Sequence, residues 1–290
     1  MEEFLHQLVS GLAIGGVYAS IALALVMVYQ ATHLINFAQG EMAMFSTYGA
    51  AALINAGVPY WVAFFSVLVV SFAAGVLLER FVVRPVAARS ALSAVAIFIG
   101  LLVIFNSVAG WIWTYSTRTF PTPFDTGMFP QNKYITSHEL GSLLVMLAEL
   151  GGLYIFFRFT SLGLAMRAAA FNPLSSRLVG VRVDLMLALG WGFAAALGAV
   201  AGMMIAPIVY LDPNMMSGVL LYGFAGALLG GIENPGGAVA GGLILGVMEN
   251  LLGAYVVGTD LKLPLALAVI VGVLTVRPSG LFGKTVVSRV

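Results

Sequence analysis

Three carboxylates lie inside otherwise apolar stretches of the chain: Glu41, Glu149 and Glu249. An ionised side chain at the centre of a lipid bilayer costs at least ~2.5–3.5 kcal/mol on insertion scales, so it faces the protein interior, pairs with a partner or takes up a proton. Such a group either lines a polar route through the membrane or holds two helices together. Both interpretations stay open for Glu41 and Glu249, and the packing contact is favoured for Glu149.

Amide side chains accompany these carboxylates. Asn36 and Gln39 come just before Glu41, and Asn106 interrupts an apolar run. Amides both donate and accept hydrogen bonds, which suits the passage of a polar solute, although a hydrogen bond between helices is the simpler role for Asn106. We predict a substrate pathway formed by Asn36, Gln39, Glu41, Asn106 and Glu249.

Covalent, redox and metal chemistry are not expected from this sequence. The chain has no cysteine, and its three histidines, His6, His33 and His138, lack metal-ligand spacing. The tail at 280–285 ends like a phosphate-binding loop, but Pro278 replaces the first glycine of that motif. We therefore predict no catalytic residue, no metal site, no cofactor and no ATP-hydrolysing machinery in the chain. Basic residues are not interleaved with exposed aromatics, which argues against nucleic acid as a partner.

The composition is that of an integral membrane protein. Among 290 residues, 9% are charged and 61% are hydrophobic, and the mean hydropathy is +1.03. A soluble domain carries about 25% charged residues, and a membrane-spanning helix needs roughly 20 apolar residues. We expect an all-α polytopic bundle of about nine such helices. The apolar runs lie at 8–30, 40–57, 60–83, 92–113, 140–158, 185–207, 218–233, 237–257 and 263–276.

The basic residues predict an orientation, because Lys and Arg beside spanning segments stay on the cytosolic side. Ten of the 13 fall into three groups: Arg80, Arg84 and Arg89; Arg158, Arg167, Arg177 and Arg182; and Arg277, Lys284 and Arg289. Nine crossings with the N-terminus outside place the loops at 84–91 and 159–184 and the C-terminal tail in the cytosol. Eight crossings are the alternative if 31–57 does not cross simply. The N-terminus lacks the positive region and cleavage site of a signal peptide, so the first run is expected to remain as a helix.

Two connecting segments differ in character. The segment 114–139 is rich in proline and polar residues and is expected to be an external loop, with Arg118 and Lys133 in it. The segment 160–184 carries apolar residues at helical spacing beside Arg167, which is typical of an amphipathic helix on the inner membrane face. These apolar residues are Leu162, Leu164, Ala165, Ala168 and Ala169. Asn172-Pro173 interrupts this helix, because a residue before proline disfavours the helical region.

Glycine spacing and polar interruptions indicate how the helices pack. Glycines recur four apart at 11/15, 198/202, 226/230, 237/241 and 242/246, a spacing that lets helix backbones approach closely in lipid. Polar or proline-containing stretches at 35–37 and 234–237 indicate broken helices. Glu79 is expected to form an ion pair with Arg80 at a membrane edge. We expect one transmembrane domain over residues 1–290.

Several motifs along the chain resemble a known family. They are Ile35-Asn36-Phe37-Ala38-Gln39-Gly40-Glu41; Glu79-Arg80 followed by Arg84-Pro85-Val86; Gly163 to Gly180 with Arg167-Ala168 and Asn172 between; Leu228-Leu229-Gly230-Gly231-Ile232 with Pro235-Gly236; Gly241-Gly242 through Glu249; and Arg277 to Gly283. In this order, from about residue 10 to 283, they resemble the LivH-type permeases of branched-chain amino acid ABC importers. The external loop 114–139 is the least similar part.

The resemblance implies a membrane subunit of the bacterial cytoplasmic membrane that works in an assembly. Its implied partners are a related LivM-type permease, two cytosolic ABC ATPases that use ATP and Mg²⁺, a periplasmic or lipid-anchored solute-binding protein, and membrane lipid. The segment 160–184 would be the coupling segment that docks on an ATPase, with Gly163, Arg167, Ala168, Asn172 and Gly180 as its residues. Branched-chain amino acids, other amino acids, urea, short amides and aromatic acids all stay possible as substrates.

Two other classes are weighed against this one. An ion-coupled secondary transporter would use Glu41 or Glu249 as proton carriers and would take up solute by itself along an ion gradient. A channel or structural membrane protein would show conductance without ATP, or none.

Overall fold

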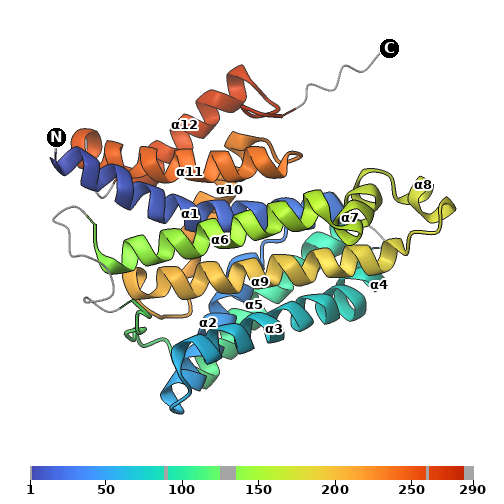
Figure 1. Cartoon of the computed structure of the whole chain (residues 1–290), viewed down its shortest axis with the longest axis horizontal. Coiled ribbons are helices and arrows are strands. Elements are labelled where there is room, and N and C mark those ends of the chain that lie inside the picture. The colour runs from blue at the N-terminus through green and yellow to red at the C-terminus, as the bar shows by residue number, and fades with distance from the viewer. Residues whose placement is uncertain (1, 88–90, 125–134, 259–260, 284–290) are drawn as a thin grey trace. The chain divides into compact units, whose positions relative to one another are not determined.

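The computed structural model describes residues 2–87, 91–124, 135–258 and 261–283, and within these ranges the regular structure is helical (Figure 1). The helices are α1 (Glu2–Thr32), α2 (Gln39–Asn55), α3 (Tyr60–Leu78), η1 (Glu79–Val83), α4 (Arg84–Ala87), α5 (Ala91–Trp113), α6 (Ser137–Phe159), α7 (Ser161–Phe171), α8 (Pro173–Leu178), α9 (Val183–Val209), α10 (Met216–Gly230), α11 (Pro235–Leu252), η2 (Gly253–Val257) and α12 (Lys262–Val276). The elements η1 and η2 are single π-helical turns. The predictions for Arg89, Lys133, Lys284 and Arg289 fall outside the described residues.

Six helices in the described part of the chain are long and apolar enough to cross a membrane, which confirms a helical, multi-pass membrane protein. They are Glu3–Thr32, Tyr60–Val86, Leu92–Trp113, Ser137–Phe159, Val183–Val209 and Pro235–Val256. The remaining predicted runs lie in α2, α10 and α12, which have 17, 15 and 15 residues. These three are shorter than a simple crossing needs, so the number of crossings stays a prediction.

The chain leaves the helical conformation at both places where the sequence predicted a break. Residues 33–38 separate α1 from α2, and His33 has a φ of 55°. Residues 231–234 separate α10 from α11, and the side chain of Asn234 accepts a hydrogen bond from Gly237 N at 3.1 Å. Pro235 follows as the first helical residue, where its missing N–H costs nothing.

The chain divides into two compact units. The first comprises Met1–Val26, Phe124–Leu144 and Gly218–Val290, and the second comprises Met27–Pro123 and Val145–Ser217. In the second unit α9 packs against α2 and α3. Small residues make this packing close: a Cβ on Gly75 would lie 2.5 Å from Trp191 O, and a Cβ on Gly198 would lie 2.9 Å from Gln39 Nε2.

In the first unit, glycines bring the early part of α1 and α10 onto α11. A Cβ on Gly11 would lie 2.9 Å from Val247 Cα, and one on Gly226 would lie 2.7 Å from Gly242 Cα. The tail after α12 returns to the end of α10, where Leu281 N donates to Leu229 O at 2.8 Å. The predicted packing role of the paired glycines is thus confirmed in both units.

The described ends of the 114–139 segment contain short ordered features. Arg118 and Leu211 exchange two backbone hydrogen bonds of 2.9 and 2.8 Å. Thr136 and Glu139 form a reciprocal capping box, in which Thr136 N donates to Glu139 Oε2 at 2.9 Å and Glu139 N donates to Thr136 Oγ1 at 3.2 Å. The helix α6 therefore begins at Ser137, and the predicted loop is three residues too long at its end.

Candidate functional site

A buried group of polar side chains lies where the chain enters α2. Asn36 and Gln39 are fully buried, and Glu41 is 6% exposed. Asn36 Nδ2 donates to Gln39 Oε1 at 3.3 Å, while Asn36 Oδ1 accepts from Ala38 N at 3.1 Å. These contacts hold the turn before α2, in which the side chain of Asn36 bonds to nearby backbone.

Gln39 connects this group to α9. Its Nε2 donates a hydrogen bond of 2.8 Å to Ala194 O, within the unit that contains both helices. Gly198 leaves the space that the amide occupies, because a Cβ there would lie 2.9 Å from Gln39 Nε2. The polar group is therefore fixed between two helices by both a hydrogen bond and a missing side chain.

Asn106 on α5 extends the same group toward the turn before α10. Its Nδ2 lies 3.4 Å from Glu41 Oε2, 3.0 Å from Pro213 O and 3.1 Å from Asn214 Oδ1. Its Oδ1 accepts from the hydroxyl of Tyr115 at 3.0 Å. The predicted hydrogen bond between Asn106 and another helix is confirmed, and its partners include the Glu41 carboxylate.

Four of the five predicted pathway residues therefore meet in one unit. Together they offer a nearly buried carboxylate and three amides that have both donors and acceptors, a set that can exchange hydrogen bonds with an amino or carboxyl group of a small solute. In the described part of the chain no three His, Cys, Asp or Glu side chains gather closely enough to hold a metal ion. This group offers hydrogen bonds and one acidic side chain.

Glu249, the fifth predicted pathway residue, belongs to the other unit. The hydroxyl of Tyr18 on α1 donates to Glu249 Oε2 at 2.7 Å, and the ring of Tyr222 stacks on Tyr18 with centroids 4.8 Å apart. Lys262 is close enough to interact electrostatically with the same carboxylate. Glu249 is thus held by a neighbouring helix of its unit.

Three of the predicted coupling residues lie on α7, while Asn172 lies between α7 and α8 and Gly180 lies in the turn after α8. Thr160 caps α7 by accepting from Gly163 N at 3.0 Å, and Gly163 is packed so tightly on α6 that a Cβ would lie 2.5 Å from Phe156 O. Arg167 and Ala168 are exposed on α7.

The predicted interruption of this segment is confirmed at Asn172. That residue is extended, and its Oδ1 caps α8 by accepting from Ser175 N at 2.9 Å. Gly180 has a φ of 86°, a conformation that favours glycine, and it turns the chain toward α9.

An apolar face of this helix turned toward lipid stays a prediction, and within the unit Ala169 is the buried member of the predicted set. The side of α7 that is buried consists of Gly163, Met166 and Ala169, whereas Leu162, Leu164 and Ala168 are exposed. Small residues let α7 lie close to its neighbours, and the larger leucines point away from the unit.

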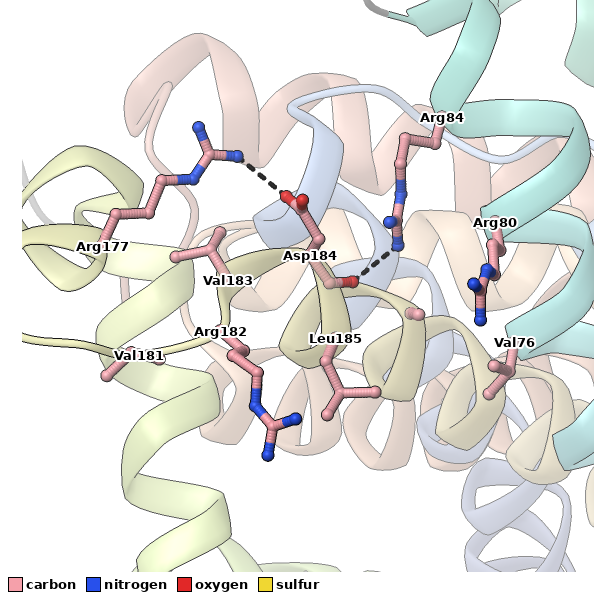
Figure 2. A pocket seen from close by; sticks show the side chains of 10 residues that line it. Val76, Arg80, Arg84, Arg177, Val181, Arg182, Val183, Asp184 and Leu185 are labelled. Carbon is pink, nitrogen blue, oxygen red and sulfur yellow. Dashed lines mark hydrogen bonds and ion pairs between the residues drawn. The ribbon is translucent and has the colours of Figure 1, made fainter.

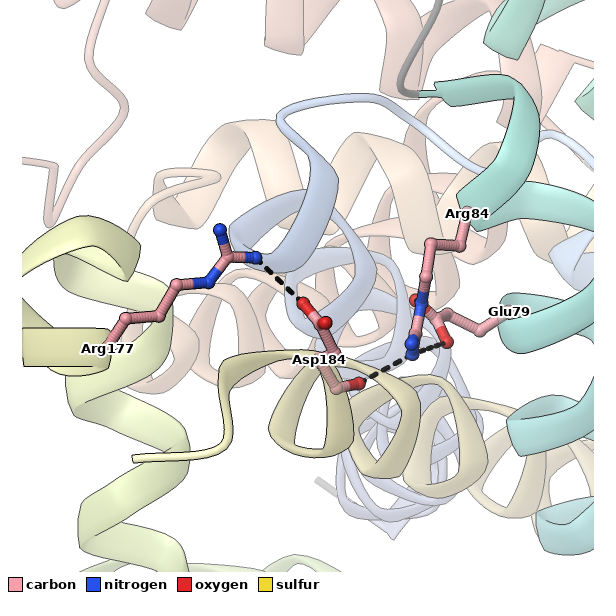
Figure 3. Close-up of polar contacts among 4 residues, drawn as sticks. All are labelled: Glu79, Arg84, Arg177 and Asp184. Atoms are coloured by element: carbon pink, nitrogen blue, oxygen red, sulfur yellow. Dashed lines mark hydrogen bonds and ion pairs between the residues drawn. The ribbon is translucent and has the colours of Figure 1, made fainter. Parts of the chain in front are cut away.

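The predicted ion pair between Glu79 and Arg80 is wrong. Glu79, which is 4% exposed, pairs with Arg84 rather than with Arg80: Arg84 Nε donates to Glu79 Oε1 at 2.9 Å and Arg84 Nη2 to Oε2 at 2.5 Å. The same Nη2 also donates to Asp184 O at 2.6 Å, and Arg177 Nη2 pairs with Asp184 Oδ1 at 2.8 Å (Figure 3). This network joins η1 and α4 to the start of α9 and to α8.

A cavity of about 420 Å³ adjoins this network (Figure 2). Four arginines line it: Arg80, Arg84, Arg177 and Arg182. Sequence patterning placed these residues in basic clusters but did not predict that arginines more than 90 positions apart, such as Arg84 and Arg177, would line one cavity.

Comparison with known proteins identifies the family. The family model described as "Branched-chain amino acid transport system / permease component" matches residues 7–274. The high-affinity branched-chain amino acid transport system permease protein LivH of Salmonella typhimurium is 31% identical over 302 residues, which cover 99% of this chain and 98% of that protein. The corresponding protein BraD of Pseudomonas aeruginosa is 31% identical over 303 residues, with the same two coverages.

A solved structure of PsaBC from Streptococcus pneumoniae in complex with Fab matches with a TM-score of 0.49 and 12% identity, over 90% of this chain and 87% of that one. The sequence matches are far stronger and extend almost from end to end. The chain therefore belongs to the branched-chain amino acid transport permease family, whose members are membrane subunits of ATP-binding cassette importers and are not enzymes themselves.

Proposed function

We propose that this chain forms one half of the pathway through which branched-chain amino acids enter a bacterium across its cytoplasmic membrane. The observation that carries the proposal is the 31% identity to LivH and BraD over 99% of the chain. The substrate is delivered by a periplasmic or lipid-anchored binding protein. A related LivM-type permease supplies the other half, and both compact units of this chain work as one permease domain.

The proposed orientation has the N-terminus outside, nine crossings and the C-terminus in the cytosol, with eight crossings as the alternative. The basic groups at 80–89 and 158–182 support this orientation, because residues from both groups lie close together. The hydrogen bonds from Arg84 and Arg177 to Asp184 bring the start of the 84–91 loop beside the 159–184 segment. Two segments that share one ionic network lie on the same side of the membrane, and their arginines favour the cytosolic side.

The substrate pathway in this proposal passes the polar group of Asn36, Gln39, Glu41 and Asn106. Amino acids carry an ammonium and a carboxylate, and these four side chains provide acceptors for the first and donors for the second. Glu41 gives the group its acidic member, and its contact with Asn106 is long, at 3.4 Å. A solute ammonium can replace that weak contact with a stronger charge-assisted hydrogen bond. Glu249 contributes a second acidic position in the other unit.

The segment 160–184 is proposed as the contact with one of two cytosolic ATPases. It contains Gly163, Arg167, Ala168, Asn172 and Gly180, and it also exposes large apolar side chains. Phe171 is 93% exposed, Leu178 83% and Val179 79%, a degree of exposure that marks an interaction surface when the residues are contiguous. ATP and Mg²⁺ act in the partner ATPases, and this chain needs no cofactor of its own.

Reconstitution tests the transport proposal. The chain, its partner permease, the ATPases and the binding protein are placed in proteoliposomes, and the uptake of labelled leucine, valine, urea and benzoate is measured. We expect ATP-dependent uptake of the branched-chain amino acids, reduced at least tenfold by Glu41→Gln without loss of assembly. Glu149→Gln, the same change in a different part of the unit, serves as the matched control and should transport normally. Uptake by the chain alone along an ion gradient would refute the proposal.

Cysteine labelling tests the orientation, since the natural chain has no cysteine. Two variants are made, Ser175→Cys on α8 and Thr122→Cys in the 114–139 segment. Both positions are exposed. In intact cells a membrane-impermeant maleimide should label the variant at 122 and spare the variant at 175. The reverse pattern would invert the orientation and remove the coupling role of 160–184.

A further inference from the structure

The cavity beside the ionic network is lined by an unusual concentration of guanidinium groups. Arg80 and Arg84 come from η1 and α4, and Arg177 and Arg182 come from α8 and from the turn before α9. Asp184 is the acidic residue of the lining, while Val76, Leu185 and Ala188 provide apolar walls. The volume of about 420 Å³ falls within the range of small-molecule sites.

The charges around the cavity do not cancel. Glu79 is satisfied by Arg84, and Asp184 by Arg177. Among the described residues, Arg80 and Arg182 have no carboxylate partner, and the neighbouring contact of Arg80 is the ring of Phe81, 5.6 Å from its guanidinium carbon. Figure 2 shows these two guanidinium groups on opposite sides of Leu185, without an ion pair. Two positive charges therefore remain in excess, and an anion placed between them would gain from both.

The cavity lies at a membrane edge whichever way the chain is oriented. The candidate span Tyr60–Val86 ends there, and the candidate span Val183–Val209 begins there. On α3, whose residue Val76 lines the cavity, large apolar residues are exposed, among them Leu77 at 52% and Val70 at 65%. A charged cavity above such a surface matches a molecule with an anionic head and an apolar body.

We propose that this cavity binds a phosphate group, supplied by the head of an anionic phospholipid whose acyl chains lie along α3. Arginine suits this ligand, since its planar guanidinium makes paired hydrogen bonds to phosphate oxygens. The ligand contacts Arg80 on one side and Arg182 on the other. It thereby links the end of α3 to the segment that precedes α9, and its occupancy stabilises the position of that segment.

Lipid binding by variants tests the site. The full-length chain, with the subunits that co-purify, is titrated with phosphatidylglycerol or phosphatidylcholine of matched acyl chains and followed by native mass spectrometry. We expect phosphatidylglycerol to bind more tightly, and removal of Arg80 and Arg182 together by Gln substitution to weaken it about 25-fold, or roughly fivefold for each arginine. Arg158→Gln, an exposed arginine outside the cavity, is the matched control and should leave binding unchanged.

A variant that is expected to bind lipid more tightly distinguishes loss of the site from misfolding. Asp184→Asn removes a negative charge from the lining and releases Arg177, so it should tighten phosphatidylglycerol binding by several-fold. A misfolded variant would lose binding instead, and a loss with Asp184→Asn in a protein of unchanged melting temperature would contradict the proposal.

A third titration identifies the source of the phosphate. Inorganic phosphate is added to delipidated protein and followed by calorimetry. If it binds with the same dependence on Arg80 and Arg182 while phosphatidylglycerol shows no preference over phosphatidylcholine, the phosphate site stands and its ligand is soluble. The proposal is overturned if neither ligand depends on these two arginines, or if the double variant loses a co-purifying ATPase while lipid binding stays unchanged.

Discussion

The contact between Gln39 and Gly198 offers a sharp test of how the polar group is held. Gln39 Nε2 donates to Ala194 O at 2.8 Å, and a Cβ on Gly198 would lie 2.9 Å from that nitrogen and 3.2 Å from Ala43 Cβ. Gly198→Ala should therefore push the buried amide away from its acceptor. We expect this substitution to destabilise the chain and to reduce transport.

The magnitude follows from three contributions. A lost hydrogen bond between membrane helices costs about 0.6–1.7 kcal/mol, and overpacking of a well-packed contact costs about 1–3 kcal/mol. Replacing glycine with alanine within a helix stabilises the helix by about 1 kcal/mol, because alanine has the higher helix propensity. Gly198→Ala should then lower the free energy of unfolding by about 0.6–3.7 kcal/mol, the sum of these contributions.

A double-mutant cycle shows whether the two residues act through one contact. In a Gln39→Ala background the amide is gone, so the added Cβ meets only Ala43, and its cost should fall by about 1 kcal/mol relative to the natural background. The free energies of unfolding are measured for the four proteins in lipid bicelles. Gly151→Ala on α6, where nothing lies within 4 Å of the added Cβ, is the control and should be neutral or stabilising.

Additivity of the two substitutions to within about 0.3 kcal/mol would contradict a shared contact, because independent sites behave in that way. A Gly198→Ala variant as stable as Gly151→Ala would contradict it as well. Either result would mean that the amide is not held by the α2–α9 contact.

Three further predictions concern the end of the unit that carries the arginines. Arg84→Gln leaves the buried Glu79 carboxylate without its partner and should lower the free energy of unfolding by about 3 kcal/mol. Thermal or chemical unfolding measures this loss. Arg80→Gln is the control and should change stability by less than about 0.5 kcal/mol, because Arg80 is exposed and forms no ion pair with a described residue. Asn172→Ala removes the cap of α8 at a cost of about 1 kcal/mol, and the ATPase rate of the assembled importer should rise less on addition of loaded binding protein. Gly180→Ala places a side chain at a φ of 86° and should lower the free energy of unfolding by about 1 kcal/mol. The stimulation of the ATPase by loaded binding protein should fall in the same way. Unchanged stimulation in both the Asn172 and the Gly180 variant would contradict a coupling role.

Much of the helical order could be predicted because it rests on local properties. Apolar runs predicted where helices form, and the interruptions at 35–37 and 234–237 predicted where they stop. Both breaks depend on chemistry within a few residues, namely a side chain that bonds to nearby backbone and a proline that cannot continue a preceding helix. No distant contact is needed for either, so the sequence was sufficient.

The partner of Glu79 could not be predicted in the same way. Adjacent residues on an α-helix do not face each other, so Arg80 points away from Glu79. An α-helix would bring residues 82 and 83 over Glu79, and both are valines. The chain instead forms a π-turn at η1, in which Arg84 N bonds to Glu79 O, and the wider turn places the residue five positions later above Glu79. The ion pair follows from the π-turn, and neither is visible from α-helical spacing.

Hydrophobicity alone does not show which side of these helices packs inside the protein. In water, large apolar residues mark the interior, but in lipid both the interior and the outer surface are apolar. On α3 the residues Ala63, Val67, Ser71 and Gly75 are buried at intervals of four, while Phe65, Val69 and Val70 are more than half exposed. Phe64 is buried beside this stripe, and Val67 within it has the same size as the exposed Val69, so neither hydrophobicity nor size alone separates the two sides. The glycines mark the closest contacts, because a Cβ on Gly75 would lie 2.5 Å from Trp191 O and one on Gly163 would lie 2.5 Å from Phe156 O. Small-residue spacing therefore locates the closest helix contacts in this protein, and the large exposed residues mark where lipid or another subunit is in contact.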